Sequence, residues 1–232
     1  MKKQIALLHA KTKRHKYALN SARRIIEQAL SRGAFVWSVS FSGGKDSTVV
    51  AALVRERLPD VPLVWSDDEW YLPETAEYMA RINNLHHIRT NANHAEWFNV
   101  SGDWGGIPEY ALAQGWDGAF LGLRQEESNQ RRVYLRTYGP LHYVMARKQW
   151  QCNPIHNWSW MDVWAYIYAN DVDYNRAYDR LDEIGVDPEH QRIGPLAVDR
   201  VLGYGQLVIL KRGWPELFNE FAAAHPEARS YV

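Results

Sequence analysis

The sequence predicts an α/β protein whose parallel sheet is covered by helices on both faces. Three observations support this fold class. Short apolar runs typical of strands alternate with stretches of helical period. A Gly-Gly-Lys-Asp-Ser loop at residues 43–47 joins the first such run to a helical pattern. The chain has 232 residues and is 46% hydrophobic, which is enough for one substantial domain with a full core.

The first half of the chain alternates regularly. Residues 11–32 form a leading amphipathic helix that ends near Gly33, because apolar residues recur at helical spacing. We expect strands over residues 34–41, 61–65, 86–90 and 118–123, and helices over residues 48–58, 74–83 and 108–114. Residues 91–106, rich in Asn, His, Trp and Gly, are expected to be irregular.

The second half is less regular. Residues 159–170 form a helix with Ser159 as the N-cap and Asp162 in the first turn. Loops are expected at 187–190 and 194–195, and a final helix at 214–224. We expect one domain over residues 1–232, with a leading helix (1–33), a core that carries the Gly-Gly-Lys-Asp-Ser loop (34–139) and a mostly helical C-terminal region (140–232). Gly139-Pro140 is the best candidate break.

The loop at residues 40–47 has the composition of a phosphate site. Glycines 43 and 44 permit positive φ and close approach to an oxyanion, Ser42 and Ser47 add donors, and Lys45 adds charge. A strand-to-helix turn with a local cap is the alternative. Asp46 stands where a Walker A loop has Ser or Thr, so that motif is excluded.

Several motifs together resemble one family. Residues 42–47 resemble the PP-loop of the adenine nucleotide α-hydrolase superfamily, whose members bind ATP or a related adenylyl nucleotide. The segments that resemble its phosphoadenosine phosphosulfate (PAPS) reductase branch are Val64 to Asp67, Leu72 to Thr75, Leu121 to Ser128 with Arg131, Asn153 to Ile155, Trp158, Asp162 to Ile167, Tyr174-Asn175 and Tyr178-Asp179. The resemblance implies a Rossmann-like PP-loop fold with a mostly helical C-terminal third.

The resemblance and the chemistry of phosphate together predict a site at the carboxyl edge of the sheet, since the loop, Asp67 and Arg124 all follow predicted strands. Attack at an α-phosphate develops negative charge that fixed cations must stabilise, so Lys45 and Arg124 are the candidate catalytic residues. The candidate nucleotide-binding residues are Ser40, Ser42, Gly43, Gly44, Lys45, Asp46, Ser47, Asp67, Gly122, Arg124, Glu127 and Arg131.

Several carboxylates have two possible roles. Asp46 either orients the loop or helps to hold Mg²⁺, and Asp67 either contacts the metal or nucleotide or is an exposed loop carboxylate. Asp68-Glu69 replace the family's usual Thr-Gly and add negative charge, which favours a magnesium requirement. Glu127 either fixes an arginine or simply begins a helix. The histidines, including His86, His87, His142, His156 and His190, show no metal-ligand spacing.

The single cysteine limits the chemistry. Cys152 cannot form an internal disulfide, and we expect no iron-sulfur cluster. The PAPS reductases carry a cysteine where Pro195 follows Ile193-Gly194 here, so reduction of PAPS or adenylylsulfate by the family route is disfavoured. Cys152 is either a small buried apolar residue or a reactive thiol near the pocket.

These observations predict an ATP-binding enzyme that transfers an adenylyl group to an unknown acceptor and releases pyrophosphate, with ATP and Mg²⁺ as its ligands. The alternative is a non-catalytic nucleotide-binding regulator or a partner-dependent subunit, and a protein partner or homodimer is possible. The net charge of zero argues against bulk coating of nucleic acid but leaves a local basic patch open. With no signal-like or membrane-length apolar run, we expect a soluble, cytoplasmic protein.

Overall fold

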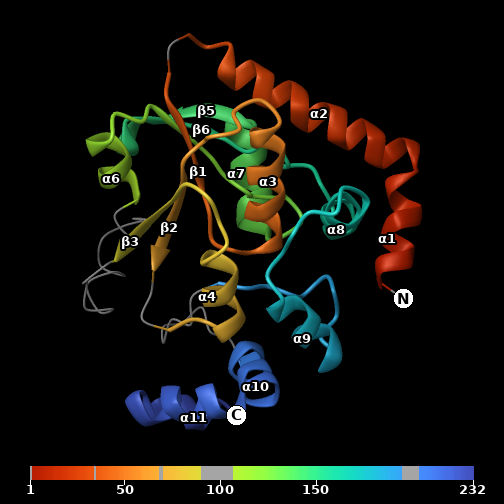
Figure 1. The fold of residues 1–232 in the computed structure, drawn as a ribbon, viewed down its shortest axis with the longest axis vertical. Coiled ribbons are helices and arrows are strands. Elements are labelled where there is room, and N and C mark those ends of the chain that lie inside the picture. The colour runs from red at the N-terminus through yellow and green to blue at the C-terminus, as the bar shows by residue number, and fades with distance from the viewer. Residues whose placement is uncertain (1, 34, 68–69, 90–106, 195–203) are drawn as a thin grey trace.

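The computed structural model describes residues 2–33, 35–67, 70–89, 107–194 and 204–232. Its strands form one six-stranded sheet in the order β3-β2-β1-β4-β6-β5 (Figure 1). The strands are β1 (Trp37–Ser40), β2 (Leu63–Asp67), β3 (Leu85–Arg89), β4 (Gly118–Phe120), β5 (Leu141–Val144) and β6 (Gln149–Cys152). The α-helices are α1 (Lys2–Ala10), α2 (Lys13–Leu30), α3 (Lys45–Arg55), α4 (Pro73–Met79), α6 (Ile107–Ala113), α7 (Asn129–Tyr138), α8 (Trp160–Ala169), α9 (Ala177–Glu183), α10 (Tyr204–Gly213) and α11 (Pro215–Ala224).

The strand order creates a switch point between β1 and β4. β1 pairs in parallel with β2 on one side and with β4 on the other, and the sheet then continues outward through β3 and through β6. Only β5, at one edge of the described sheet, is antiparallel. The predicted parallel sheet is therefore confirmed, and the loops after β1 and β4 flank the crevice where open α/β sheets bind ligands.

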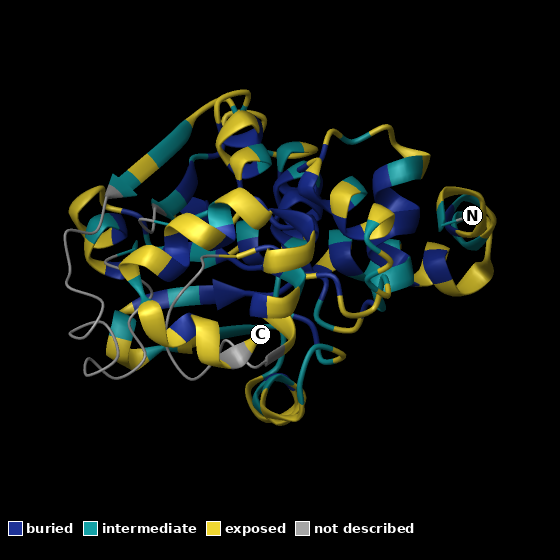
Figure 2. Ribbon diagram, turned by 90° about the horizontal axis from the view of Figure 1, so that it is seen from below, coloured by how far each residue is buried: buried dark blue, intermediate teal, exposed yellow. Residues whose placement is uncertain are grey.

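Apolar residues cover both faces of the sheet. On β2, Leu63 belongs to the main core, whereas its neighbour Val64 packs on the other face with Ala111 of α6 and Trp116. Successive strand residues point to opposite faces, so full burial of both shows that helices cover the sheet on both sides. Figure 2 shows the buried residues concentrated along the centre of the molecule.

The predicted leading helix is two helices. Thr12 has an extended backbone, and its side chain accepts a hydrogen bond from the His15 backbone N–H at 3.1 Å. Thr12 is therefore the N-cap of α2 and separates it from α1. The apolar periodicity of residues 11–32 correctly indicated α2. It could not indicate α1, whose outward face carries exposed Ile5 and Leu8.

Two strands and three helices lie where none was predicted. β5 and β6 join the sheet as an antiparallel pair, turning through Lys148 in the left-handed region at φ 51°. Four-residue strands of mixed polarity give little alternation to recognise. Helices α7 and α10, of ten residues each, and α9, of seven, were likewise not predicted. The predicted irregular segment 91–106 and Pro195 lie outside the described residues.

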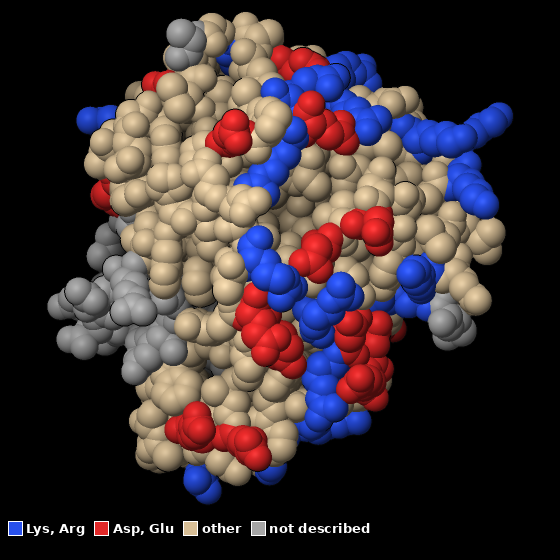
Figure 3. Space-filling model, in the orientation of Figure 1, with Lys and Arg blue, Asp and Glu red and all other residues tan. Residues whose placement is uncertain are grey.

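The surface carries charges of both signs. In the view of Figure 3, acidic and basic side chains lie close to one another over much of the face. Among the described residues, no helix is both long and apolar enough to cross a membrane.

Candidate functional site

The phosphate-type loop connects β1 to α3 at the switch point (Figure 1). Gly43 has φ +71°, as predicted, but Gly44 does not: it is the extended N-cap of α3, with φ −77°. Of the two loop glycines, Gly43 alone has a positive φ. Ser47 Oγ closes the loop by accepting from the Ser42 backbone N–H at 3.2 Å and donating to the Gly44 carbonyl at 3.0 Å.

Lys45 begins α3 and is almost completely buried, with 2% of its surface exposed. Its ammonium donates to the Gln191 carbonyl oxygen at 2.8 Å and lies 3.4 Å from Asp46 Oδ2. The Lys45 backbone N–H donates to the Tyr178 hydroxyl at 2.9 Å. The predicted helix over 48–58 therefore begins three residues earlier, which places Lys45, Asp46 and Ser47 in its first turn.

Asp46 and Arg124 form the central ion pair of the site. Arg124 Nε donates to Asp46 Oδ1 at 2.6 Å, and its Nη1 donates to Glu126 Oε2 at 2.7 Å, with only 3% of the arginine exposed. Burial disfavours the Asp46 anion, but Lys45 and Arg124 outweigh it and hold the pKa of Asp46 below its usual range. The three groups together form a compact, nearly buried charge cluster.

Gly122 allows the segment after β4 to approach the loop closely. A Cβ at this position would lie 2.9 Å from both the Asp46 carbonyl carbon and the Ser47 nitrogen, so a larger residue would displace backbone. Arg124 lies two residues later, and its backbone N–H donates to Glu127 Oε2 at 2.9 Å.

Glu127 and Arg131 lie at the outer edge of the charge cluster. They form an ion pair at the start of α7, so the arginine that Glu127 holds is Arg131. Arg131 remains 40% exposed in its side chain, whereas Glu127 is 10% exposed. The Glu127 carbonyl also accepts from Arg192 Nη2 at 2.7 Å, which connects this edge to the C-terminal segment.

Ser40 and Asp67 are the last residues of β1 and β2. Because these neighbouring strands are parallel, both residues lie at the same edge of the sheet as the loop and Arg124. The Asp67 side chain, with Asp68 and Glu69, lies outside the described residues.

The magnesium prediction for Asp46 has little support in this arrangement. One Asp46 oxygen accepts from Arg124 and the other faces Lys45, so cations of the protein already occupy the positions a metal would take. Of the two roles predicted for Asp46, orientation of the loop fits the contacts.

Tyr178, Gln191 and Glu126 contact the site but were not predicted to. Tyr178 is fully buried, and burial raises the pKa of its hydroxyl. Glu126 accepts from the Trp160 backbone N–H at 2.6 Å as well as from Arg124, and so joins the site to the start of α8. Because Glu126 is adjacent to Glu127, which was predicted as a site residue, a contact of Glu126 with the site could have been predicted from the sequence. Nothing local to Gln191 indicates a carbonyl that reaches Lys45 from 146 residues away.

Cys152 is the last residue of β6 and is completely buried. Burial raises the pKa of its thiol, so the thiolate form that attacks sulfur is strongly disfavoured. This environment agrees with the interpretation of Cys152 as a small buried apolar residue.

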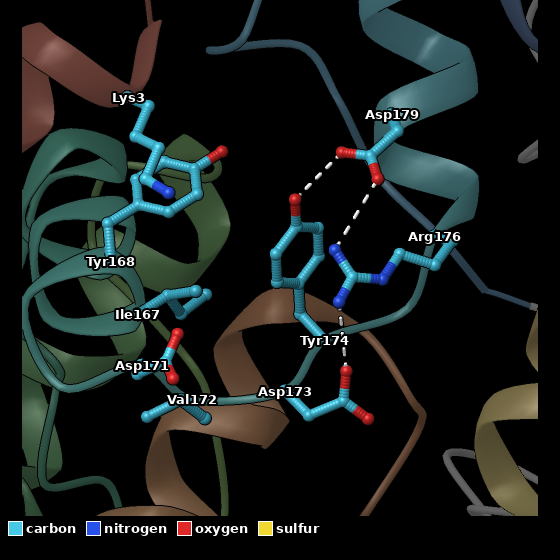
Figure 4. A pocket seen from close by; sticks show the side chains of 9 residues that line it. All are labelled: Lys3, Ile167, Tyr168, Asp171, Val172, Asp173, Tyr174, Arg176 and Asp179. Carbon is cyan, nitrogen blue, oxygen red and sulfur yellow. Dashed lines mark hydrogen bonds and ion pairs between the residues drawn. The ribbon is translucent and has the colours of Figure 1, made fainter.

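A cavity of about 610 Å³ opens beside α8 and α9 and involves none of the predicted site residues (Figure 4). Tyr174 donates to Asp179 Oδ1 at 2.7 Å, and Arg176 pairs with Asp173 and Asp179. The charged groups that line the cavity therefore largely neutralise one another. The lining residues are Lys3, Ile167, Tyr168, Asp171, Val172, Asp173, Tyr174, Arg176 and Asp179.

Comparison with known proteins identifies relatives of both the sequence and the fold. The chain is 25% identical over 228 residues to an uncharacterized protein of Methanocaldococcus jannaschii, covering 90% of this chain but only 52% of the relative. It is 26% identical over 203 residues to the phosphoadenosine 5'-phosphosulfate reductase of Buchnera aphidicola, covering 73% of this chain and 78% of that enzyme. The chain thus spans about half the length of the archaeal relative.

Two solved structures share the fold. The PAPS reductase of Candida auris superimposes with a TM-score of 0.54 at 18% identity, covering 76% of this chain and 88% of that one. The FMN adenylyltransferase of Candida glabrata in complex with ATP superimposes with a TM-score of 0.55 at 15% identity, covering 76% of this chain and 65% of that one.

The sequence model of the phosphoadenosine phosphosulfate reductase domain matches residues 37–100 and 110–195, which is more than half of the chain. The match contains the loop after β1, Arg124 after β4, and both Tyr178 and Gln191. The chain therefore belongs to the phosphoadenosine phosphosulfate reductase domain family, within the PP-loop adenine nucleotide α-hydrolase superfamily.

Proposed function

We propose that this protein binds ATP or a closely related adenylyl nucleotide at the PP-loop and acts at the α-phosphate. The observation that carries the proposal is the placement of two buried cations, Lys45 and Arg124, beside the start of α3 at the switch point of the sheet. Helix N-termini and fixed cations both favour phosphate oxygens. The family and the ATP-bound neighbour of similar fold support an adenine nucleotide as the ligand.

In the proposed reaction, an acceptor attacks the α-phosphorus, the bond to the bridging oxygen of the β-phosphate breaks, and pyrophosphate leaves with that electron pair. Lys45 and Arg124 would stabilise the charge that develops on the phosphate oxygens. A lysine ammonium has three N–H donors, and in the described part of the chain two of them face Gln191 and Asp46. One donor therefore remains for a phosphate oxygen.

Binding is tested by calorimetric titration of ATP, PAPS, adenylylsulfate and GTP, each with and without Mg²⁺. Lys45→Met should weaken binding by roughly 10- to 100-fold, because a charge-assisted hydrogen bond contributes about 1.5–3 kcal/mol. Lys16→Met, which removes an exposed lysine of α2, is the matched control and should bind normally. Unchanged affinity of Lys45→Met would contradict the assignment of the loop.

Turnover is tested separately, by pyrophosphate and AMP release in the presence of candidate acceptors: sulfate, a sulfur carrier, a nucleobase in RNA, and a protein. The proposal expects ATP-dependent pyrophosphate release with one of them. Nucleotide binding without release under any condition would refute adenylyl transfer while leaving the binding site intact.

One observation favours a second candidate, a nucleotide-binding regulator or a subunit that requires a partner. Gln191 closes over Lys45, and Arg192 fixes the same segment to Glu127, so the cations are shielded in the isolated chain. Tight binding with turnover that appears only after a partner is added would support this candidate.

The buried thiol argues against a reductase. Cys152→Ser should leave every nucleotide-dependent activity unchanged, because the sulfur is completely buried and its thiolate form is disfavoured. Loss of PAPS or adenylylsulfate reduction in this variant would restore the reductase hypothesis.

A further inference from the structure

Two imidazoles and one carboxylate converge where α1, α2 and α8 meet. Asp162 Oδ1, on α8, lies 2.7 Å from His9 Nε2 of α1 and 3.2 Å from His15 Nδ1 of α2. These three atoms all lie within 4.8 Å of one another. The histidines show no metal-ligand spacing along the sequence, but the fold brings His9 and His15 to Asp162, which is 147 or more positions away.

The carboxylate is held in one orientation. Its second oxygen, Oδ2, accepts from the Ser159 backbone N–H at 2.9 Å and from the Ser159 hydroxyl at 2.7 Å, as part of the capping box of α8. Oδ1 is thereby directed at the two histidines. Hydrogen bonds of this kind to a ligating carboxylate are the usual outer support of metal centres.

The histidines are supported to different degrees. The side chains of His15 and Asp162 are 4% and 1% exposed, and the His15 ring packs edge-on against Trp158 at 5.7 Å. The His9 side chain is 18% exposed, so the cluster reaches solvent at His9.

We propose that His9, His15 and Asp162 bind a divalent transition-metal ion of the Zn²⁺ type. Imidazole nitrogen and carboxylate oxygen are zinc ligands, and three protein ligands leave a fourth position for water. Zinc-ligand distances of about 2.0–2.1 Å place tetrahedral ligands about 3.3 Å apart. The His15 distance fits this value already, and the His9 distance fits after an outward shift of about 0.6 Å.

Besides the shift of His9, binding requires that the nitrogen of each imidazole that faces Asp162 carry no proton, so that it presents a lone pair to the ion. The neighbouring guanidinium of Arg14 lies 4.0 Å from Oδ2, not Oδ1, and its side chain is 70% exposed, so it does not occupy the ion's position.

The proposed site lies partly outside the region that the family model matches. The family match begins at residue 37, so both histidines precede it, whereas Asp162 lies inside it. Because α1 packs along α8, a bound ion would fix the two N-terminal helices to α8.

The full chain, stripped of metal with a chelator, is titrated with Co²⁺ and followed by visible absorption, and Zn²⁺ stoichiometry is measured by equilibrium dialysis. We expect one ion per chain, with an intense tetrahedral Co²⁺ spectrum. His9→Ala and His15→Ala should weaken binding by more than about 100-fold, since even outer-shell losses reach that value. His190→Ala, which removes an exposed histidine, is the control.

Thermal unfolding gives an independent readout: Zn²⁺ should raise the Tm of the parent and of His190→Ala but not that of the two ligand variants. If His15→Ala does not fold, the partly exposed His9 still decides the question. Absence of the Co²⁺ spectrum, or equal binding by His9→Ala and His190→Ala, would overturn the proposal and leave Asp162 as a hydrogen-bond acceptor only.

Discussion

Replacement of Asp46 tests whether the buried charge cluster stabilises the fold. Asp46→Asn keeps the size of the side chain but leaves Lys45 and Arg124, which are 2% and 3% exposed, without their shared anion. Removing one partner of a buried ion pair usually costs 3–5 kcal/mol. Here Arg124 keeps Glu126 and Lys45 keeps the Gln191 carbonyl, so we expect the lower end, about 3 kcal/mol.

The free energy of unfolding is measured by urea titration at pH 7, and a loss of about 3 kcal/mol corresponds to a Tm about 6–12 °C lower for a chain of this size. Asp60→Asn, which neutralises an exposed carboxylate, is the control and should change stability by less than about 0.5 kcal/mol. A loss below about 1 kcal/mol for Asp46→Asn would refute the view that this anion compensates two buried cations.

The pH dependence provides a second check on the same variant. The pKa of Asp46 is lowered in the folded state, so the unfolded chain takes up the proton more readily as the pH falls. The stability due to this charge is fully present above about pH 4 and is lost as the pH falls through the folded pKa. The difference between parent and Asp46→Asn should therefore shrink on acidification, and a difference that stays constant down to pH 3 would contradict the assignment.

Three further changes probe the surroundings of the loop. Gly122→Ala should destabilise by about 1–3 kcal/mol and weaken ATP binding, because its Cβ would press on the backbone of Asp46; urea titration and calorimetry measure the two effects. Tyr178→Phe removes the acceptor of the Lys45 N–H and should cost about 1–3 kcal/mol by thermal unfolding, with no loss if water replaces the hydroxyl. Ser159→Ala removes the N-cap of α8 and should cost about 1–2 kcal/mol in the same assay, a smaller loss indicating that Glu126 caps the helix alone.

Sequence patterns predicted the loop at residues 42–47 and the position of Arg124. Residues 42–47 are adjacent, and Arg124 follows a strand, so strand alternation was enough to place both at one edge of the sheet. Local patterns also identified the cap of α8 at Ser159. They were wrong about Gly44 because either glycine could have supplied the positive φ, and only the packed loop determines which one does.

The contacts that no local pattern contains were missed. Tyr178 reaches Lys45 across 133 residues, and His9 reaches Asp162 across 153, so each depends on how the whole sheet brings its helices together. The strands β5 and β6 were missed for a different reason. Each is four residues long, and the hydrogen bonds that their sequences do not specify come from the pairing of β5 with β6 and of β6 with β4.

The position of Gln191 links the loop to the C-terminal part of the chain. The Lys45 ammonium that a phosphate would contact also donates to the Gln191 carbonyl, and Arg192 fixes the same segment to Glu127 beside Arg124. If a nucleotide draws Lys45 toward its phosphates, the hydrogen bond to Gln191 weakens, and the lost free energy lowers the affinity for that nucleotide. Residues 191–192 would therefore influence the proposed nucleotide binding through Lys45, even without a contact of their own to the nucleotide.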